Sequence, residues 1–186
     1  MVFRDSSKGL PGSGKWRQSI DIYDVNGDGY LDILAPSPRL PSNEEDRRPH
    51  VWYGDGKGGW SEARLRFPQG SRFFYGGICG GDFDGDGITD LALAMHTMGL
   101  KGLRGNGKGG YEAFSDGLPS EEVFTSRAVV AADVNNDGTP DVVSVSELFP
   151  KGPALSSGGR LYVCLGSKGG WKCQAFGHEA VRRDSV

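Results

Sequence analysis

The chain has 186 residues, 31 of them glycine, and a formal net charge of −3. No apolar run approaches the ~18 residues of a membrane-spanning helix, and no stripe of Lys and Arg could follow nucleic-acid phosphates. These features exclude a transmembrane helix and a dedicated nucleic-acid-binding protein, and the glycine content predicts a β protein rich in turns.

The N-terminal 15 residues contain Val2-Phe3 followed by Gly9-Leu-Pro11, and the later run Glu112-Ala-Phe114 is followed by Gly117-Leu-Pro119 in the same way. This similarity predicts that the N-terminus is the outer strand of a preceding repeat unit. Residues 1–5 lack the apolar core of a signal peptide.

The first repeat unit contains four short strands. A run at residues 19–23 precedes the loop Asp24-Val-Asn26-Gly-Asp28-Gly29-Tyr30-Leu-Asp32, and an apolar run at 31–35 follows it. Both runs are short and bounded by turn residues, so we expect antiparallel strands joined by the loop. A third strand at 50–53 then enters the turn Tyr53-Gly-Asp-Gly-Lys-Gly-Gly-Trp60, which is typical of a hairpin.

The same plan occurs twice more along the chain. The loops Asp82–Asp90 and Asp133–Asp141 begin 58 and 51 residues after the loop before them, and glycine-rich turns end at Tyr111 and Trp171. Four-stranded units that repeat every ~50 to 58 residues predict the blades of a β-propeller. The expected strands of these two units are 76–81, 90–94, 102–104, 128–132, 141–145 and 161–165.

Each of the three loops has the oxygen ligands that Ca²⁺ prefers. Side-chain oxygens stand at loop positions 1, 3, 5 and 9, glycine stands at position 6, and position 7 offers a backbone carbonyl. An EF-hand is excluded because position 12 is Ala35, Leu93 or Ser144 rather than Glu. We therefore expect about three Ca²⁺ per chain. The expected ligands are Asp24, Asn26, Asp28, Tyr30, Asp32, Asp82, Asp84, Asp86, Ile88, Asp90, Asp133, Asn135, Asp137, Thr139 and Asp141.

The loops and the hairpins that follow them resemble the FG-GAP/VCBS repeats of integrin α-subunit propellers and of many secreted bacterial proteins. The resemblance extends from about Trp16 to Phe176 and implies that Ca²⁺ lies between the first and second strands of each blade. The chain departs from the pattern where Asn26 and Asn135 replace Asp, which lowers the charge of two sites. The expected fold is all-β, with three four-stranded antiparallel propeller blades at about 16–66, 72–115 and 124–176, and with inter-blade or edge segments at 1–15 and 177–186.

Two of the three cysteines flank the third hairpin. If Gly166 pairs with Trp171, Cys164 and Cys173 face each other across the strands. They then form either a disulfide, as in an oxidising compartment, or two packed thiols. Cys79 has no partner in the sequence, and we expect it to be packed in an inner strand.

The sequence predicts a binding module rather than an enzyme. His50, His96 and His178 are dispersed, and no nucleophile-elbow or zinc-hydrolase motif occurs. The spacing of the aspartates assigns them to metal binding rather than to glycoside cleavage. We expect an extracellular, cell-surface or periplasmic module with an adhesion, ligand-binding or scaffold role. The alternative is an accessory propeller segment of a larger secreted polysaccharide-active enzyme.

Three blades are fewer than the ~4 of the smallest closed propeller. We therefore expect further blades or another protein chain to complete the ring, most simply as a two-fold dimer with six blades. A protein or glycan ligand is expected at the rim opposite the metal loops, because recognition concentrates in loops on a rigid scaffold. The irregular insertions expected on this rim are 36–49, 95–100 and 147–159, with the links 72–75 and 123–127. Alternatively, 36–49 is a solvated charged loop and the aromatic residues are inter-blade packing.

Overall fold

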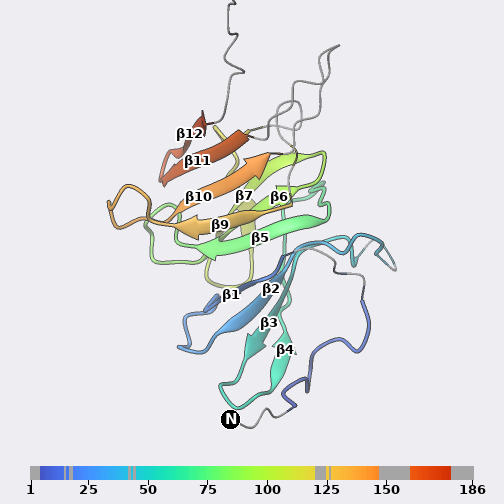
Figure 1. The fold of residues 1–186 in the computed structure, drawn as a ribbon. Coiled ribbons are helices and arrows are strands. Elements are labelled where there is room, and N and C mark those ends of the chain that lie inside the picture. The colour runs from blue at the N-terminus through green and yellow to red at the C-terminus, as the bar shows by residue number, and fades with distance from the viewer. Residues whose placement is uncertain are drawn as a thin grey trace, which may run out of the picture.

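The computed structural model describes residues 5–14, 16, 19–41, 43, 45–119, 125, 127–146 and 160–176. Within these residues, twelve strands form three separate four-stranded antiparallel sheets (Figure 1). In each sheet the strands follow one another in chain order, so each sheet is a simple meander. The prediction of an all-β chain with three propeller blades is confirmed.

The three sheets have closely similar layouts. The strands are β1 (Asp21–Tyr23), β2 (Asp32–Ala35), β3 (His50–Gly54) and β4 (Trp60–Glu62); β5 (Gly76–Gly81), β6 (Asp90–Met95), β7 (Gly99–Gly105) and β8 (Tyr111–Ala113); and β9 (Val129–Ala132), β10 (Asp141–Ser146), β11 (Arg160–Ser167) and β12 (Gly170–Phe176). The metal loops connect β1 to β2, β5 to β6 and β9 to β10.

The expected irregular insertion at residues 95–100 is wrong. Met95 still belongs to β6, and β7 already begins at Gly99, so only three residues turn between the strands. The N–H of Met98 bonds the carbonyl of Met95 at 3.1 Å, and Thr97 and Gly99 have φ values of 63° and 81°. These positive φ values reverse the chain within the tight turn, which leaves no room for a longer loop.

The first strands of the three sheets lie side by side, with β5 between β1 and β9 (Figure 1). A Cβ added at Gly77 of β5 would lie 2.8 Å from the carbonyl oxygen of Arg127 and 3.1 Å from Oγ of Ser19. The inner strand is therefore crowded at this position, where glycine fits and a larger residue would not.

Two hydrophobic cores hold the sheets together. The first two sheets share a core in which Leu91 and Leu93 of β6 pack with Leu34 and Val51. Ala92 and Ala94 point to the other face of β6, where they join the core shared with the third sheet. The alternation of side chains along one strand thus allows the middle sheet to contribute to both cores.

The outward faces of the two flanking sheets are open. Ile20 and Ile22 are 54% and 46% exposed beside the first sheet, whereas every residue of β5 and β6 is buried. On the third sheet, cross-strand neighbours share an open apolar face. The exposed residues of this face are Val130, Val145, Leu161 and Phe176.

Each hairpin aromatic is bonded to the segment that leads into its own sheet. The N–H groups of Trp60, Tyr111 and Trp171 donate to the carbonyls of Lys8, Arg66 and Asp116 at 2.9, 2.8 and 2.9 Å. The segment 5–11 thus contacts the first sheet through Lys8. The links that lead into the second and third sheets make the equivalent contacts through Arg66 and Asp116. The predicted N-terminal strand at Val2-Phe3, and the segment 177–186, lie outside the described residues.

Candidate metal centre

The three Asp-rich loops share one backbone conformation. At loop position 6, Gly29, Gly87 and Gly138 have φ values of 86°, 85° and 90°. This is the left-handed region that glycine enters without the steric cost of a Cβ. Position 4 is also left-handed, which the sequence did not predict, with φ of 73°, 74° and 59° at Gly27, Gly85 and Asn136. Asn tolerates this conformation better than most residues with a side chain.

The carboxylate at position 1 organises each loop. Asp82 accepts the N–H groups of Asp86 and Gly87, both at 2.9 Å. Asp24 and Asp133 bind the corresponding N–H groups of their own loops at 2.8 to 3.1 Å. These bonds turn the chain back on itself and direct the alternate side chains toward the same space.

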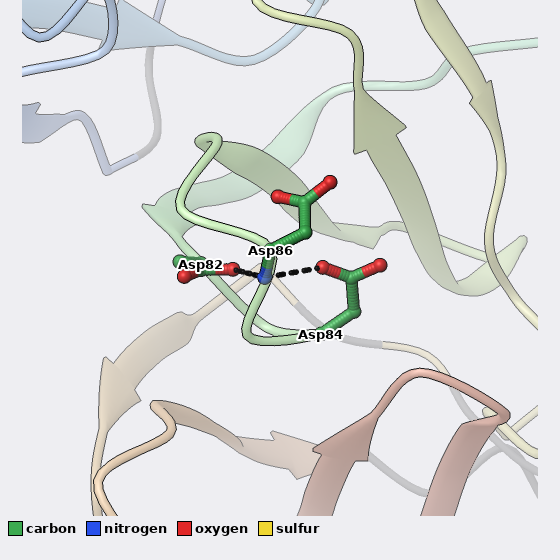
Figure 2. Close-up of side chains that lie close together, drawn as sticks. All are labelled: Asp82, Asp84 and Asp86. Carbon is green, nitrogen blue, oxygen red and sulfur yellow. Dashed lines mark hydrogen bonds between the residues drawn. The ribbon is translucent and has the colours of Figure 1, made fainter.

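In the middle loop, three carboxylates converge. Asp82, Asp84 and Asp86 each offer an oxygen, and these oxygens lie within 4.8 Å of one another (Figure 2). Figure 2 also shows the N–H of Asp86 between Asp82 and Asp84, to which it donates at 2.9 and 3.1 Å. Three adjacent negative charges repel one another unless a cation neutralises them. The middle loop can therefore hold a metal ion.

The carboxylate at position 9 is buried at the base of each loop. Asp90 accepts the N–H of Phe83 at 3.1 Å and that of Gly105, on β7, at 2.8 Å. Asp32 and Asp141 make the same pair of bonds within their own sheets. Position 9 therefore ties the loop to the third strand of its blade. A carboxylate has about four acceptor sites, so these two bonds leave capacity for a cation.

The position 9 carboxylates have raised pKa values. Burial raises the pKa of Asp90 to about 7, its hydrogen bonds to Gly105 and Phe83 oppose this shift, and the charges of Asp84 and Asp86 add to it. Burial likewise raises the pKa of Asp32 and of Asp141. A bound cation favours the ionised form and would lower these pKa values.

The loops differ at position 3. In the flanking loops, the amide groups of Asn26 and Asn135 donate to Asp28 and Asp137 at 2.9 and 2.7 Å. In the middle loop, a carboxylate occupies this position, and Arg104 contacts it with 2.7 Å between Nε of Arg104 and Oδ2 of Asp84. Arg104 could not be identified from the sequence, because it lies on β7 and meets the loop only in the folded sheet.

The structure places every expected side-chain ligand in its own loop. At position 7, the N–H groups of Tyr30, Ile88 and Thr139 each donate to the position 5 carboxylate at 2.8 Å. That the position 7 carbonyls would contact an ion remains a prediction. A cavity of about 970 Å³ opens at the first loop, where Asn26 and Asp28 line it with residues of the adjacent hairpin.

The third hairpin has the predicted register. Gly166 pairs with Trp171 and Cys164 with Cys173, and the two sulfurs are bonded. Of the two alternatives, the disulfide is therefore correct. Cys79 is buried in β5, as expected, and carries a free thiol.

The rim opposite the metal loops contains two cavities near the expected ligand segments. One, of about 420 Å³, is lined by Trp16, His50, Trp52 and Glu62 among others. Its three rings pack on one another with centroids 5.6 Å apart, and Nδ1 of His50 lies 2.8 Å from Oε1 of Glu62. These rings therefore already pack against one another within the first blade.

The second cavity on this rim, of about 320 Å³, is basic and aromatic, and Arg47, Arg72, Phe73 and Phe74 line it. Nearby, the guanidinium of Arg39 lies 5.4 Å from the ring centre of Tyr75. The expected ligand segment 147–159 and residues 123, 124 and 126 lie outside the described residues.

In the part of the chain that the structure describes, no helix is long and apolar enough to cross a membrane.

Comparison with known proteins identifies the repeats. Residues 82–144, which include the second and third loops, match the family model of the FG-GAP-like repeat. The chain is also 29% identical over 136 residues to integrin alpha-4 of Xenopus laevis. That alignment covers 64% of this chain but only 13% of the integrin subunit, so the chain spans a small part of this relative. Together with the three sheets and their loops, these matches confirm that the chain carries FG-GAP-type propeller repeats.

Proposed function

We propose that this chain is a Ca²⁺-binding, extracellular β-propeller module with a non-enzymatic adhesion, ligand-binding or scaffold role. The observation that carries the proposal is the convergence of three carboxylates within 4.8 Å in the middle loop. The loops that begin at Asp24 and Asp133 have the same conformation, so we extend the proposal to all three loops and to about three Ca²⁺ per chain. All fifteen loop residues named from the sequence remain the proposed ligands.

The role of the ion follows from the loop geometry. Each loop joins the first two strands of a sheet, and its position 9 carboxylate reaches the third strand. A cation would neutralise carboxylates that otherwise repel one another. Ca²⁺ thus stabilises the inner part of each blade, and the aspartates hold the ion rather than act as acids or bases.

The open faces of the flanking sheets support the proposal that a partner packs against this chain. They expose aliphatic side chains on the sides where another blade would pack, as the middle blade packs within this chain. We propose that further blades, or another protein chain, cover them and complete the propeller. The proposed blade limits remain about 16–66, 72–115 and 124–176.

Two features support the proposed location and the proposed ligand surface. The Cys164–Cys173 disulfide is typical of proteins in an oxidising compartment, which agrees with an extracellular, cell-surface or periplasmic location. The cavity between Arg47 and Arg72 lies on the rim proposed to bind a protein or glycan. Its guanidinium groups would suit an acidic group of that ligand.

Thermal unfolding of the full chain after chelation tests the metal-binding function. Added Ca²⁺ should raise the melting temperature by mass action, with saturation near the ~10⁻⁴ to 10⁻³ M typical of extracellular modules. Asp86→Ala should reduce this rise, because it removes a central carboxylate. Asp55→Ala is the matched control, since Asp55 lies in the first hairpin outside the loops. A melting temperature of the wild-type chain that does not respond to Ca²⁺ would reject the proposal.

A further inference from the structure

The middle loop is the only one of the three with a carboxylate at position 3. In the flanking loops, the side-chain amide at this position donates a hydrogen bond to the position 5 carboxylate. Asp84, when ionised, has no proton to donate to Asp86. The middle loop therefore lacks an internal hydrogen bond that the other two possess, and has an additional negative charge.

Arg104 meets this charge from β7. Its Nε lies 2.7 Å from Oδ2 of Asp84, whose side chain is only 6% exposed. Its Nη2 donates to the carbonyl of Lys168 at 2.9 Å, in the hairpin of the third sheet. The guanidinium also lies 4.3 Å from the ring centre of Phe114. Contacts on three sides thus hold the arginine beside the middle loop.

The other two blades have no cation at the equivalent place. Arg104 directly precedes Gly105, whose N–H binds the position 9 carboxylate Asp90. Gly54 and Gly166 play the same part in the flanking blades, and the residues before them are Tyr53 and Leu165. At this position, arginine is therefore present only in the blade where loop position 3 is Asp.

The two differences cancel in charge. Each flanking loop carries three aspartates among positions 1, 3, 5 and 9, and the middle loop carries four. The guanidinium beside Asp84 offsets the additional charge, so with every carboxylate ionised all three sites have a formal charge of −3.

We propose that Arg104 is a built-in counter-ion of the middle metal loop, which stabilises the loop without metal and lowers its affinity for Ca²⁺ to that of its neighbours. This inference rests on the proposed function. Arg104 is a positioning residue: it competes with the cation for Asp84 and does not contact the ion. Through Lys168 it also connects the middle loop to the third blade.

A double-mutant cycle on the full chain tests the proposal. Arg104→Leu installs the residue of the third blade, Asp84→Asn installs the residue of both flanking loops, and the double variant combines them. Calorimetric titration of the chelated proteins with Ca²⁺ should show one site tightened at least about tenfold in Arg104→Leu, the effect that an adjacent charge has on carboxylate ionisation. Asp84→Asn should weaken one site by a similar factor, and the double variant should return to within about threefold of wild type.

Melting temperatures separate this role from simple packing. Arg104→Leu should lower the melting temperature in chelator and recover most of the loss in saturating Ca²⁺, because the ion replaces the missing charge. Arg66→Leu is the matched control, since Nη2 of Arg66 also donates to a hairpin carbonyl, that of Lys108, at 2.9 Å. Arg66→Leu should lower the melting temperature by the same amount with and without Ca²⁺. Arg104→Lys keeps the charge and should leave Ca²⁺ affinity within about threefold of wild type.

The outcomes distinguish the two proposals. If wild type binds Ca²⁺ and Arg104→Leu binds it with unchanged affinity, the counter-ion role is wrong and the proposed function stands. If the double variant binds Ca²⁺ as weakly as Asp84→Asn alone, removal of Arg104 does not restore affinity and the counter-ion role is also overturned. If wild type does not bind Ca²⁺, the proposed function and this inference both fail.

Discussion

The middle blade and the flanking blades are built from the same repeat but differ in what covers them. Every residue of β5 and β6 is buried, because the middle sheet has a neighbour on both faces. In the third sheet, Val145 and Leu161 are 49% and 40% exposed. Equivalent strands thus become core or surface according to whether another blade is present, which shows that a blade is a unit of packing and not an independent domain.

The largest expected effect is the loss of a leucine side chain from the middle blade. Leu93 is fully buried, so Leu93→Ala should lower the free energy of unfolding by about 2 to 5 kcal/mol. The same substitution at Leu161, which faces the open side, should cost less than about 1 kcal/mol in a dilute sample. Urea denaturation measures both values. Equal costs would show that the two faces are equally covered in solution.

The next largest effect concerns the crowding of the inner strands. Gly77→Val should cost about 1 to 3 kcal/mol, because its side chain would meet the backbone of Arg127 and the hydroxyl of Ser19. Gly12→Val is the control, since no atom lies within 4 Å of a Cβ at Gly12. If both variants unfold at the same urea concentration, β5 is not confined between its neighbours.

Association should depend on the open faces. A charge placed in the apolar face of the third sheet by Val145→Glu should weaken self-association by at least about tenfold, because the carboxylate must lose water at an apolar contact. Light scattering at micromolar concentration measures the mass. Leu40→Glu is the control, as Leu40 is exposed on the rim rather than on a sheet face. A wild-type chain that remains a monomer of 19.9 kDa would contradict the prediction.

Much of this architecture could be predicted from the sequence, because it depends on residues close together in the chain. The Asp spacing and the runs around it predicted the strands β1, β2, β5, β6, β9 and β10. The position of the third turn predicted that Cys164 would face Cys173.

The contacts that were missed join residues far apart in the sequence. Arg104 reaches Asp84 only because β7 lies beside β6, and the indole N–H of Trp171 donates to the carbonyl of Phe114 from 57 residues away. The buried bond from Gly105 on β7 to Asp90 likewise requires the folded sheet. The turn at 96–98 was missed because His96, Thr97 and Met98 are not typical turn residues.

The smallest expected effect is a pH dependence that is strongest in the middle loop. Without metal, the folded pKa of Asp90 is about 7, above the ordinary value of 3.8. The folded chain then binds more protons than the unfolded chain from about pH 4 to 7, so this contribution to stability is lost as the pH rises through 7. In chelator, the melting temperature should therefore be lower at pH 8 than at pH 6. Saturating Ca²⁺ should remove this trend, and a rise between pH 6 and 8 in chelator would contradict it.

The number of Ca²⁺ bound by the metal-free chain tests the central claim most directly. The middle loop has three convergent carboxylates, whereas each flanking loop has an amide in place of one. If the shared loop conformation creates the site, calorimetric titration should give about three Ca²⁺ per chain, falling to about two in Asp86→Ala. A stoichiometry of one that Asp86→Ala abolishes would show that only the middle loop binds the ion, and a stoichiometry of zero would contradict the account as a whole.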